Sequence, residues 1–456
     1  MGFSTPERCS SKPRRTRGAG ENRDDMTTIQ LAHGHDTVEL RVPDTATILK
    51  PTEAPAGVFG ADAVRSALES PIGTPSLEEL VRARSPRRVA ITISDITRAV
   101  PNKVFLPPIL ETLERAGIPD DAIVIVVGTG MHRPSTPAEH EILVGRDVLA
   151  RYRVVDHRAD DPATLVTVSD DPYVAVSREF AEAEFRIVTG FIEPHFMAGF
   201  SGGRKGVCPA LVDLATIQRF HGYETLASAS AREGLLEGNP CHEIASEVAR
   251  TVGVDFLFNV AINRNKQIVG IYCGDLFEAH ERGCRDVMRW NGAKIDRRYD
   301  IVVTSGGGAP LDHTFYQTVK GLCMALPALH TGSTLLIVSS CYEQLGSDEY
   351  VALMREYGAR PAEFISRIAR DAGRTGKDQW EYQMQCRVID RIGVENILFV
   401  SDDLSPEYQA IAAVTPVAGP GTATERAQSA LDRLLAERPD ASVAVIPDGP
   451  YTMLLE

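Results

Sequence analysis

The chain has 456 residues, of which 43% are hydrophobic and 24% are charged, and its net charge is -14. A chain of this length exceeds the size at which one hydrophobic core keeps growing, so two domains are expected. The acidic balance argues against nucleic acid or an anionic membrane surface as the main partner, because both require a basic face. The sequence also lacks the apolar core of a secretory signal and any apolar run approaching about 18 residues. We therefore expect a soluble, cytoplasmic protein.

The first 25 residues differ in composition from the rest of the chain. Residues 1–25 are polar and carry clustered basic side chains among Ser, Gly and Pro. Such a composition predicts a disordered extension, and Met26 is then an alternative start of the protein. Eight cysteines are scattered along the whole chain without a CxxC pair, which indicates reduced thiols rather than a disulfide framework or a structural zinc site. Cys208 is set apart by its position beside Lys205.

Short runs rich in Val and Ile recur along the chain and end in loops with polar or glycine residues. They lie at residues 87–95, 121–130 and 184–190, and then at 299–308, 333–341, 396–403 and 441–449. Helical patterns lie between them, for example over 104–117. This alternation predicts an α/β fold of two domains, each built on a largely parallel sheet with helices on both faces. A polar segment at 275–298 separates the two sets, so we place the domains at 26–285 and 286–456.

Chemically useful side chains follow the predicted strands. Asp95 and Arg98 follow the first strand, His132 the second and His195 the third, while Gln317 and Lys320 follow the first strand of the second set. Ligands of open parallel sheets bind beyond the carboxyl ends of the strands. A guanidinium suits two-pronged binding of a substrate carboxylate, although an Asp95–Arg98 ion pair that stabilises the turn is an alternative. Two imidazoles facing one cavity would suit proton transfer near neutral pH.

The segment 190–222 contains the densest group of reactive side chains. Gly202 and Gly203 allow positive backbone angles and the close approach of a bound anion or planar ring. Lys205 follows them, and His221 ends an apolar-periodic run that reads as a helix. One loop and one helix are thus predicted to present His195, Lys205 and His221 to a common pocket. The GGRK sequence lacks Walker spacing, and no GxGxxG follows the first strand.

Four motifs occur in a characteristic order. They are DITR at 95–98, GTGMHR at 128–133, PHFMAGFSGGRK at 194–205 with the trailing His221, and YQTVK at 316–320. Together they resemble the nickel-pincer lactate racemase family over roughly Met26 to the C-terminus. The resemblance implies an isomerase that inverts the hydroxyl-bearing carbon of a 2-hydroxy acid, lactate or a larger analogue, as a racemase or epimerase. It also implies an active site in the cleft between the domains.

The resemblance further implies a cofactor and its attachment. Enzymes of this family use a nickel-pincer nucleotide, pyridinium-3,5-bisthiocarboxylic acid mononucleotide nickel, which other proteins assemble; cofactor-biosynthesis proteins are therefore expected partners. Lys205 matches the lysine that binds this cofactor covalently as a thioamide, next to Gly202 and Gly203, and His221 matches the histidine that ligates nickel. His132 and His195 match the two acid/base histidines. One of them takes the hydroxyl proton during hydride transfer from Cα to the cofactor, and the other returns a proton.

The remaining matches concern the substrate. Arg98, Gln317 and Lys320 match residues that hold its carboxylate and oxygen. Asp95 is expected behind Arg98, with Tyr316 nearby. Trp380 matches an aromatic wall of the site, and the alternative for Trp380 is an ordinary packed Trp at a domain contact. Met197 stands where some relatives carry a cysteine, so no catalytic thiol is expected there. An NAD-dependent 2-hydroxy acid dehydrogenase is disfavoured by the missing GxGxxG. A non-catalytic binding protein for the nucleotide would be expected to lack one of the two acid/base histidines, yet both are present.

Overall fold

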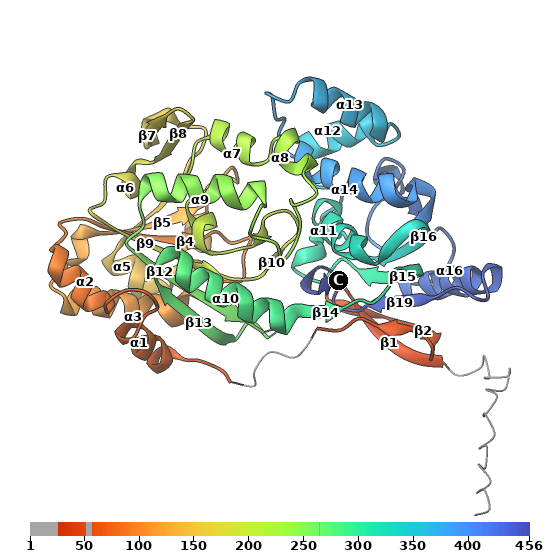
Figure 1. Ribbon diagram of the computed structural model, residues 1–456, viewed down its shortest axis with the longest axis horizontal. Coiled ribbons are helices and arrows are strands. Elements are labelled where there is room, and N and C mark those ends of the chain that lie inside the picture. Colours follow the sequence, from red (N-terminus) through yellow and green to blue (C-terminus); the bar gives the residue numbers. More distant parts are fainter. Residues whose placement is uncertain (1–25, 52–56, 264) are drawn as a thin grey trace, which may run out of the picture.

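The computed structural model describes residues 26–51, 57–263 and 265–456. The predicted disordered extension, residues 1–25, lies outside the described residues. Two six-stranded sheets form the two halves of the molecule (Figure 1). The predicted α/β fold of two domains on largely parallel sheets with helices on both faces is confirmed. In the described part of the chain, no helix combines the length and apolar character that a bilayer span requires.

The first sheet has the strand order β13-β12-β9-β4-β5-β6, and only the β12–β13 pair is antiparallel. Its strands are β4 (Val89–Ser94), β5 (Ile123–Gly128), β6 (Arg153–Asp156), β9 (Phe185–Phe191), β12 (Phe256–Ile262) and β13 (Ile268–Gly274). The strands β4, β5 and β9 confirm the first three predicted runs. Their sequences are continuously apolar because both faces of the sheet are buried. In β4, for example, Val89 and Ile91 enter one core and Ala90 enters the other.

Helices cover both faces of this sheet (Figure 1). One face packs against α1 (Ala61–Glu69), α2 (Leu77–Arg84), α3 (Asn102–Arg115), α4 (Pro137–Val144) and α5 (Arg146–Arg151). The other packs against α6 (Arg178–Ala181), α7 (Leu214–Phe220), α9 (Pro240–Val252) and α10 (Leu276–Asn291). Shorter elements on this side are β7 (Leu165–Asp170), β8 (Tyr173–Ser177), β10 (Pro194–His195), β11 (Gly199–Phe200) and α8 (Tyr223–Ala227). The loops beyond the strand ends are thereby held between rigid elements.

The second sheet is parallel throughout, with the order β18-β17-β16-β15-β19-β3. Its strands are β3 (Thr47–Ile48), β15 (Tyr299–Ser305), β16 (Leu329–Val338), β17 (Ile397–Val400), β18 (Thr415–Pro416) and β19 (Val443–Ile446). One face packs against α11 (Phe315–Ala325) and α14 (Gln379–Ile392), and the other against α16 (Ala423–Glu437). The helices α12 (Asp348–Tyr357), α13 (Pro361–Arg370) and α15 (Pro406–Gln409) lie outside these layers, and β14 (Gly292–Lys294) pairs with β20 (Met453–Leu455).

The first strands of the predicted N-terminal domain pack on the second sheet. The hairpin of β1 (Met26–His33) and β2 (Asp36–Pro43) packs with α16 on the second sheet, as Figure 1 shows beside β19. Its Leu31 shares a core with Ile301 and Val303, and β3 adds a strand next to β19. Residues 26–49 therefore belong with the second half, since tertiary packing and not the local pattern selects the partner of a strand. The division near residue 285 stays a prediction.

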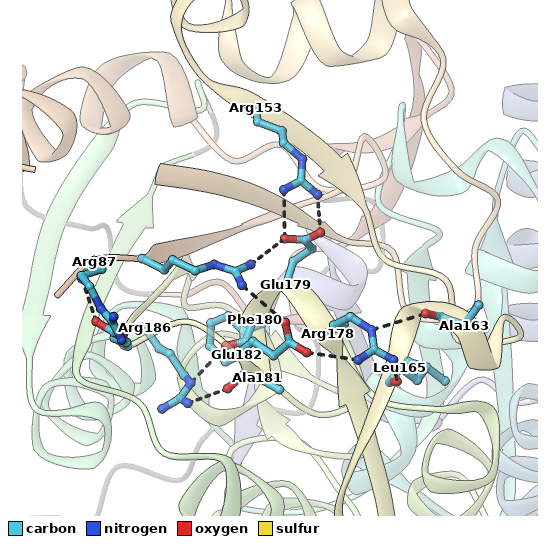
Figure 2. Close-up of polar contacts among 12 residues, drawn as sticks. Arg87, Arg153, Ala163, Leu165, Arg178, Glu179, Phe180, Ala181, Glu182 and Arg186 are labelled. Atoms are coloured by element: carbon cyan, nitrogen blue, oxygen red, sulfur yellow. Dashed lines mark hydrogen bonds and ion pairs between the residues drawn. The ribbon is translucent and has the colours of Figure 1, made fainter. Parts of the chain in front are cut away.

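A network of ion pairs lies at the edge of the first sheet where β4 and β6 begin (Figure 2). Glu179 of α6 pairs with Arg88, just before β4, at 3.2 Å, and with Arg153, the first residue of β6. Glu182 joins Arg88 at 3.4 Å and Arg178 at 3.1 Å. The network ties α6 to the starts of two strands, at the edge opposite to the carboxyl ends of those strands.

Candidate active site

A cavity lies beyond the carboxyl ends of β4, β5 and β9, and α11 and the start of α14 from the second half close its other side. All the predicted site residues except Gly203 line this cavity: Asp95, Arg98, His132, His195, Gly202, Lys205, His221, Tyr316, Gln317, Lys320 and Trp380. The predicted location in a cleft between the two halves matches this geometry. The residues converge because parallel strands deliver their following loops to the same edge of a sheet.

His132, in the loop after β5, forms a pair with the Asp95 carboxylate, in the loop after β4. Nδ1 of His132 lies 2.6 Å from Oδ2 of Asp95, whose Oδ1 accepts a 2.6 Å hydrogen bond from the Thr97 hydroxyl. Burial alone would raise the pKa of Asp95, but the interaction with His132, the hydrogen bond from Thr97 and the charge of Arg98 hold that pKa below its usual value. Asp95 is therefore ionised, Nδ1 of His132 carries a proton, and Nε2 can accept one. Among the described residues, the Asp95 carboxylate is thus hydrogen-bonded to the side chains of His132 and Thr97 and not to that of Arg98.

His195, which follows β9, has its proton on Nε2, whereas His132 has its proton on Nδ1. Its Nδ1 lies 3.4 Å from the backbone N of Met197 and 3.2 Å from that of Ala198. Backbone amides only donate, so Nδ1 accepts and the neutral ring carries its proton on Nε2. Burial lowers the pKa of His195 well below its usual value, and the charge of Lys205 adds to this effect. The cavity is thus lined by one imidazole able to accept a proton and a second, neutral one able to donate a hydrogen bond through Nε2.

His221 ends α7, where its side chain is fixed on both sides. Nδ1 lies 2.9 Å from the carbonyl oxygen of Ile217, so Nδ1 donates and Nε2 keeps its lone pair. Burial lowers the pKa of His221 to about 3, which keeps the ring neutral. Trp380 stacks on this ring with a centroid distance of 4.6 Å, and its indole N–H donates to the Tyr316 hydroxyl at 2.9 Å. The Trp380 side chain is therefore both a wall of the cavity and a contact between the halves.

The glycines adopt the predicted backbone but serve another purpose. Gly202 and Gly203 have φ angles of +77° and +55°. A Cβ atom on Gly203 would lie 2.4 Å from the ring of His280, and one on Gly202 would lie 2.5 Å from Oδ1 of Asn259. These two positions thus permit the close approach of other side chains of the protein, those of His280 and Asn259. Packing against α10 and β12, rather than room for a bound anion or ring, explains the need for glycine.

Two basic side chains reach the cavity from opposite halves. Among the described residues, the side chains of Arg98 and Lys320 have no hydrogen-bond partner and no ion pair within 4 Å. Gln317 lies one helical turn before Lys320 on α11, and its buried Oε1 also lacks a partner. Unpaired donors at a cavity wall suit a small carboxylate ligand.

Glu381 is a cavity residue that the sequence did not reveal. It is 2% exposed, it lines the cavity beside Trp380, and its Oε1 has no hydrogen-bond partner. Burial raises the pKa of the Glu381 carboxyl, while burial lowers the pKa of the Lys320 amine that it faces. Glu381 stands in a helix rich in polar residues, which is typical of a solvent-exposed helix, so no sequence signal marks it as buried.

The cysteine singled out by the sequence has no chemical role in this geometry. Cys208 is fully buried, and burial raises the pKa of its thiol to about 12. A thiol of this kind stays protonated and is a poor nucleophile. Met197 is also buried, 2% exposed, so no thiol or other reactive group stands at that position.

The sequence and the fold both match known lactate racemases. A model of the lactate racemase N-terminal domain matches residues 33–234, and a model of the C-terminal domain matches residues 295–453. The lactate racemase of Thermoanaerobacterium thermosaccharolyticum is 30% identical over 441 residues, which cover 94% of this chain and 100% of the relative. That of Lactiplantibacillus plantarum is 34% identical over 433 residues, which cover 93% and 99%.

Solved structures agree with these sequence matches. The lactate racemase apoprotein of T. thermosaccharolyticum superposes with a TM-score of 0.84 at 29% identity, covering 94% of this chain and 100% of that one. A Thermotoga maritima protein, at 15% identity and a TM-score of 0.63, shares the fold; the match covers 87% of this chain and 98% of that one. The chain therefore belongs to the lactate racemase family and is an isomerase.

Proposed function

We propose that the protein racemises or epimerises a 2-hydroxy acid at its hydroxyl-bearing carbon, in the cytoplasm, with a nickel-pincer nucleotide that cofactor-biosynthesis proteins supply. The curated relatives are named for lactate, so lactate or a larger analogue is the proposed substrate. The observation that carries this proposal is the pair of imidazoles with opposite tautomers in one cavity. Inversion requires a proton to be taken at one face of the substrate and returned at the other.

The residues present fit the proposed cofactor. A nickel centre would take a soft or borderline donor from the protein, and imidazole is a suitable one. His221 offers its Nε2 lone pair while Nδ1 donates to a backbone carbonyl, an arrangement typical of metal-binding histidines. Lys205 places an amine in the same cavity, and burial lowers the pKa of that amine to about 7. We therefore assign His221 to nickel and Lys205 to covalent attachment, with the loop at Gly202 supporting Lys205.

The chain's own residues would bind and orient the substrate. Arg98 and Lys320 approach from the two halves with unpaired positive groups, which suit the substrate carboxylate. The unpartnered Oε1 of Gln317 can accept a hydrogen bond from the substrate hydroxyl. Tyr316 acts through Trp380, whose ring it fixes against His221. We propose that the two halves act as domains and that the substrate is held between them.

Proton movement follows from the two tautomers. Nε2 of His132 accepts the proton of a substrate hydroxyl on its side of the cavity, while Asp95 stabilises the imidazolium that results. On the other side, the Nε2–H of His195 donates a hydrogen bond to the substrate oxygen, and this ring would return a proton only from its imidazolium form. The bound cofactor supplies the acceptor for the hydrogen of Cα. Two histidines are needed because the two enantiomers place their hydroxyls differently.

Polarimetry on the loaded enzyme tests this proposal. The protein is produced together with the cofactor-biosynthesis proteins and incubated with a panel of pure 2-hydroxy acids. At least one acid should lose its optical rotation from either enantiomer without accumulation of the keto acid. Lys205→Ala should abolish the added mass on the intact protein, while His221→Ala should lower nickel content and leave attachment intact. A loaded sample with Lys205 unmodified and no nickel would contradict the proposal.

A further inference from the structure

The surroundings of Lys205 contain positive groups without matching negative ones. Arg204, the preceding residue, is 1% exposed, and it donates to the carbonyl oxygens of Phe200 at 3.0 Å and Ala198 at 2.7 Å. Among the described residues no carboxylate pairs with Arg204, so its charge is uncompensated next to Lys205. Arg98 adds a second positive charge across the cavity. Both charges disfavour protonation of the Lys205 amine.

The hydrogen bonds of His195 lead to the same result by a separate route. Nζ of Lys205 lies 3.3 Å from Nε2 of His195. Because the backbone N–H groups of Met197 and Ala198 occupy Nδ1, the proton of His195 is on Nε2 and points at the lysine. An ammonium group at Lys205 would place its own N–H donors against this N–H donor, and neither group could accept a hydrogen bond. A neutral amine instead accepts from it through its lone pair.

We propose that His195 has a second role before any turnover: its fixed tautomer holds Lys205 as a neutral amine, so that the apoprotein itself is competent to form the covalent bond to its cofactor. The inference rests on the proposed attachment at Lys205 and adds the residue that prepares it. Burial, followed by the charges of Arg204 and Arg98, lowers the pKa of Lys205 to about 7, which agrees with this assignment.

The other groups near the amine do not reverse this balance. The thiols of Cys208 and Cys241 would favour a charged lysine only as thiolates, and burial raises the pKa of each to about 12. His221 is neutral. The Phe220 ring, 5.0 Å from Nζ, is the one aromatic face among the described residues that favours the cation, and it also removes water from the amine.

A neutral amine is what the attachment reaction requires. Its lone pair attacks the carbon of a thiocarboxylic acid arm, a C–N bond forms and a C–O bond breaks. Water leaves with one proton from the amine and one from the thiocarboxylic acid, and a thioamide remains. No electrons are gained or lost, so no redox partner is needed. An ammonium group has no lone pair and cannot begin this reaction.

Trace labelling of lysines in the apoprotein tests the proposal without the cofactor. The protein is treated with acetic anhydride from pH 6 to pH 10, and the acetylation rate of each lysine is measured by peptide mass spectrometry. Labelling of Lys205 should level off just above pH 7. An unperturbed lysine has a pKa of about 10.4, so its labelling rate rises about tenfold per pH unit up to at least pH 9. The exposed Lys103 and Lys294 are measured in the same samples for comparison.

Variants separate the role of His195 from that of burial. His195→Ala should raise the pH at which labelling of Lys205 levels off by at least one unit. His132 is an imidazole of the same cavity that is bound to Asp95 instead, so His132→Ala should leave this pH unchanged. A wild-type Lys205 that labels in parallel with Lys103 overturns the proposal whether or not the variants fold. Because nickel and optical rotation are not measured, this failure is distinguishable from failure of the proposed function.

Discussion

The Asp95 carboxylate determines which nitrogen of His132 faces the cavity. Its 2.6 Å contact with Nδ1 leaves Nε2 free, and Asp95 is buried at 6% exposure. Carboxylates in this position keep an imidazole in one tautomer and stabilise its charged form. The sequence placed Asp95 behind Arg98 as a substrate-binding residue, and the geometry instead supports a role in proton transfer.

Asp95→Asn separates these two roles. An amide does not stabilise the imidazolium of His132, so kcat of the loaded enzyme should fall by about 10²-fold or more, while KM stays within a few fold. Racemisation rates by polarimetry at several substrate concentrations measure both constants. Thr97→Val, which removes only the hydroxyl that supports Asp95, is the matched control with a much smaller loss in kcat. A large rise in KM with unchanged kcat would instead assign Asp95 to the substrate.

The sequence predicted which residues meet, but not how they are paired. Side chains that follow parallel strands must gather at one edge, so the strand pattern alone was enough to place Asp95, His132 and His195 together. Their hydrogen bonds depend on loop geometry at the scale of single ångströms. Glu381 was missed because α14 is packed between neighbours distant in sequence, chiefly α11 and β16, and local sequence does not encode this packing.

At the scale of single elements, α6 is anchored far from the cavity. Glu179 pairs with Arg88 at 3.2 Å and also with Arg153, so one short helix is fixed to the starts of β4 and β6 (Figure 2). Exposed ion pairs contribute little individually, but a shared carboxylate orders two arginines at once. The carboxyl ends of the same strands carry the site. The network should therefore contribute to stability without affecting turnover.

Glu179→Gln tests this separation of roles. The free energy of unfolding, from urea titration, should fall by about 1 kcal/mol, and 1 M salt should remove most of the difference. The kcat of the loaded enzyme should match that of the wild type. Glu114→Gln, which loses one exposed 3.4 Å contact with Arg151, should change stability by less than about 0.5 kcal/mol. A changed kcat in Glu179→Gln would show that α6 communicates with the site.

Elements with strong local patterns were predicted well, and those defined by distant partners were not. The runs that became β4, β5, β9 and β15 are apolar on both faces, which a reader of the sequence can recognise. The hairpin β1–β2 has an ordinary alternating pattern, and nothing in it specifies that it joins α16 nearly 400 residues later. Its packing on the second sheet could therefore not be predicted from the local sequence.

Across the whole molecule, the two halves meet where the proposed nickel ligand lies. Three side chains of the second half donate hydrogen bonds to backbone carbonyl oxygens of the first half. Thr375 donates to Gln218 at 3.0 Å, Gln383 to Tyr223 at 2.9 Å, and Arg387 to Ala231 at 2.7 Å. These acceptors flank His221, on which Trp380 also stacks. The position of His221 therefore depends on both halves, which accounts for a site whose residues are far apart in sequence.

The pH dependence of global stability can be traced to a buried histidine outside the cavity. His157, at the exit of β6, is 2% exposed, and its Nε2 lies 2.9 Å from the carbonyl oxygen of Val212. Burial lowers the pKa of His157 to about 4, against about 6.5 in an unfolded chain. Between these values the unfolded state binds more protons than the folded state. The contribution to the free energy of unfolding is therefore full above pH 6.5 and is lost as the pH falls towards 4.

His157→Gln isolates this contribution, because an amide can still donate to the Val212 carbonyl but does not titrate. The variant should be less stable than the wild type at pH 7, and the difference should shrink by about 2 kcal/mol by pH 4.5. Urea titrations at half-unit steps measure both curves. His35→Gln, at an exposed histidine, is the control substitution. Parallel curves for wild type and His157→Gln would mean that the pKa of His157 is the same in the folded and unfolded states, which would contradict the effect of burial.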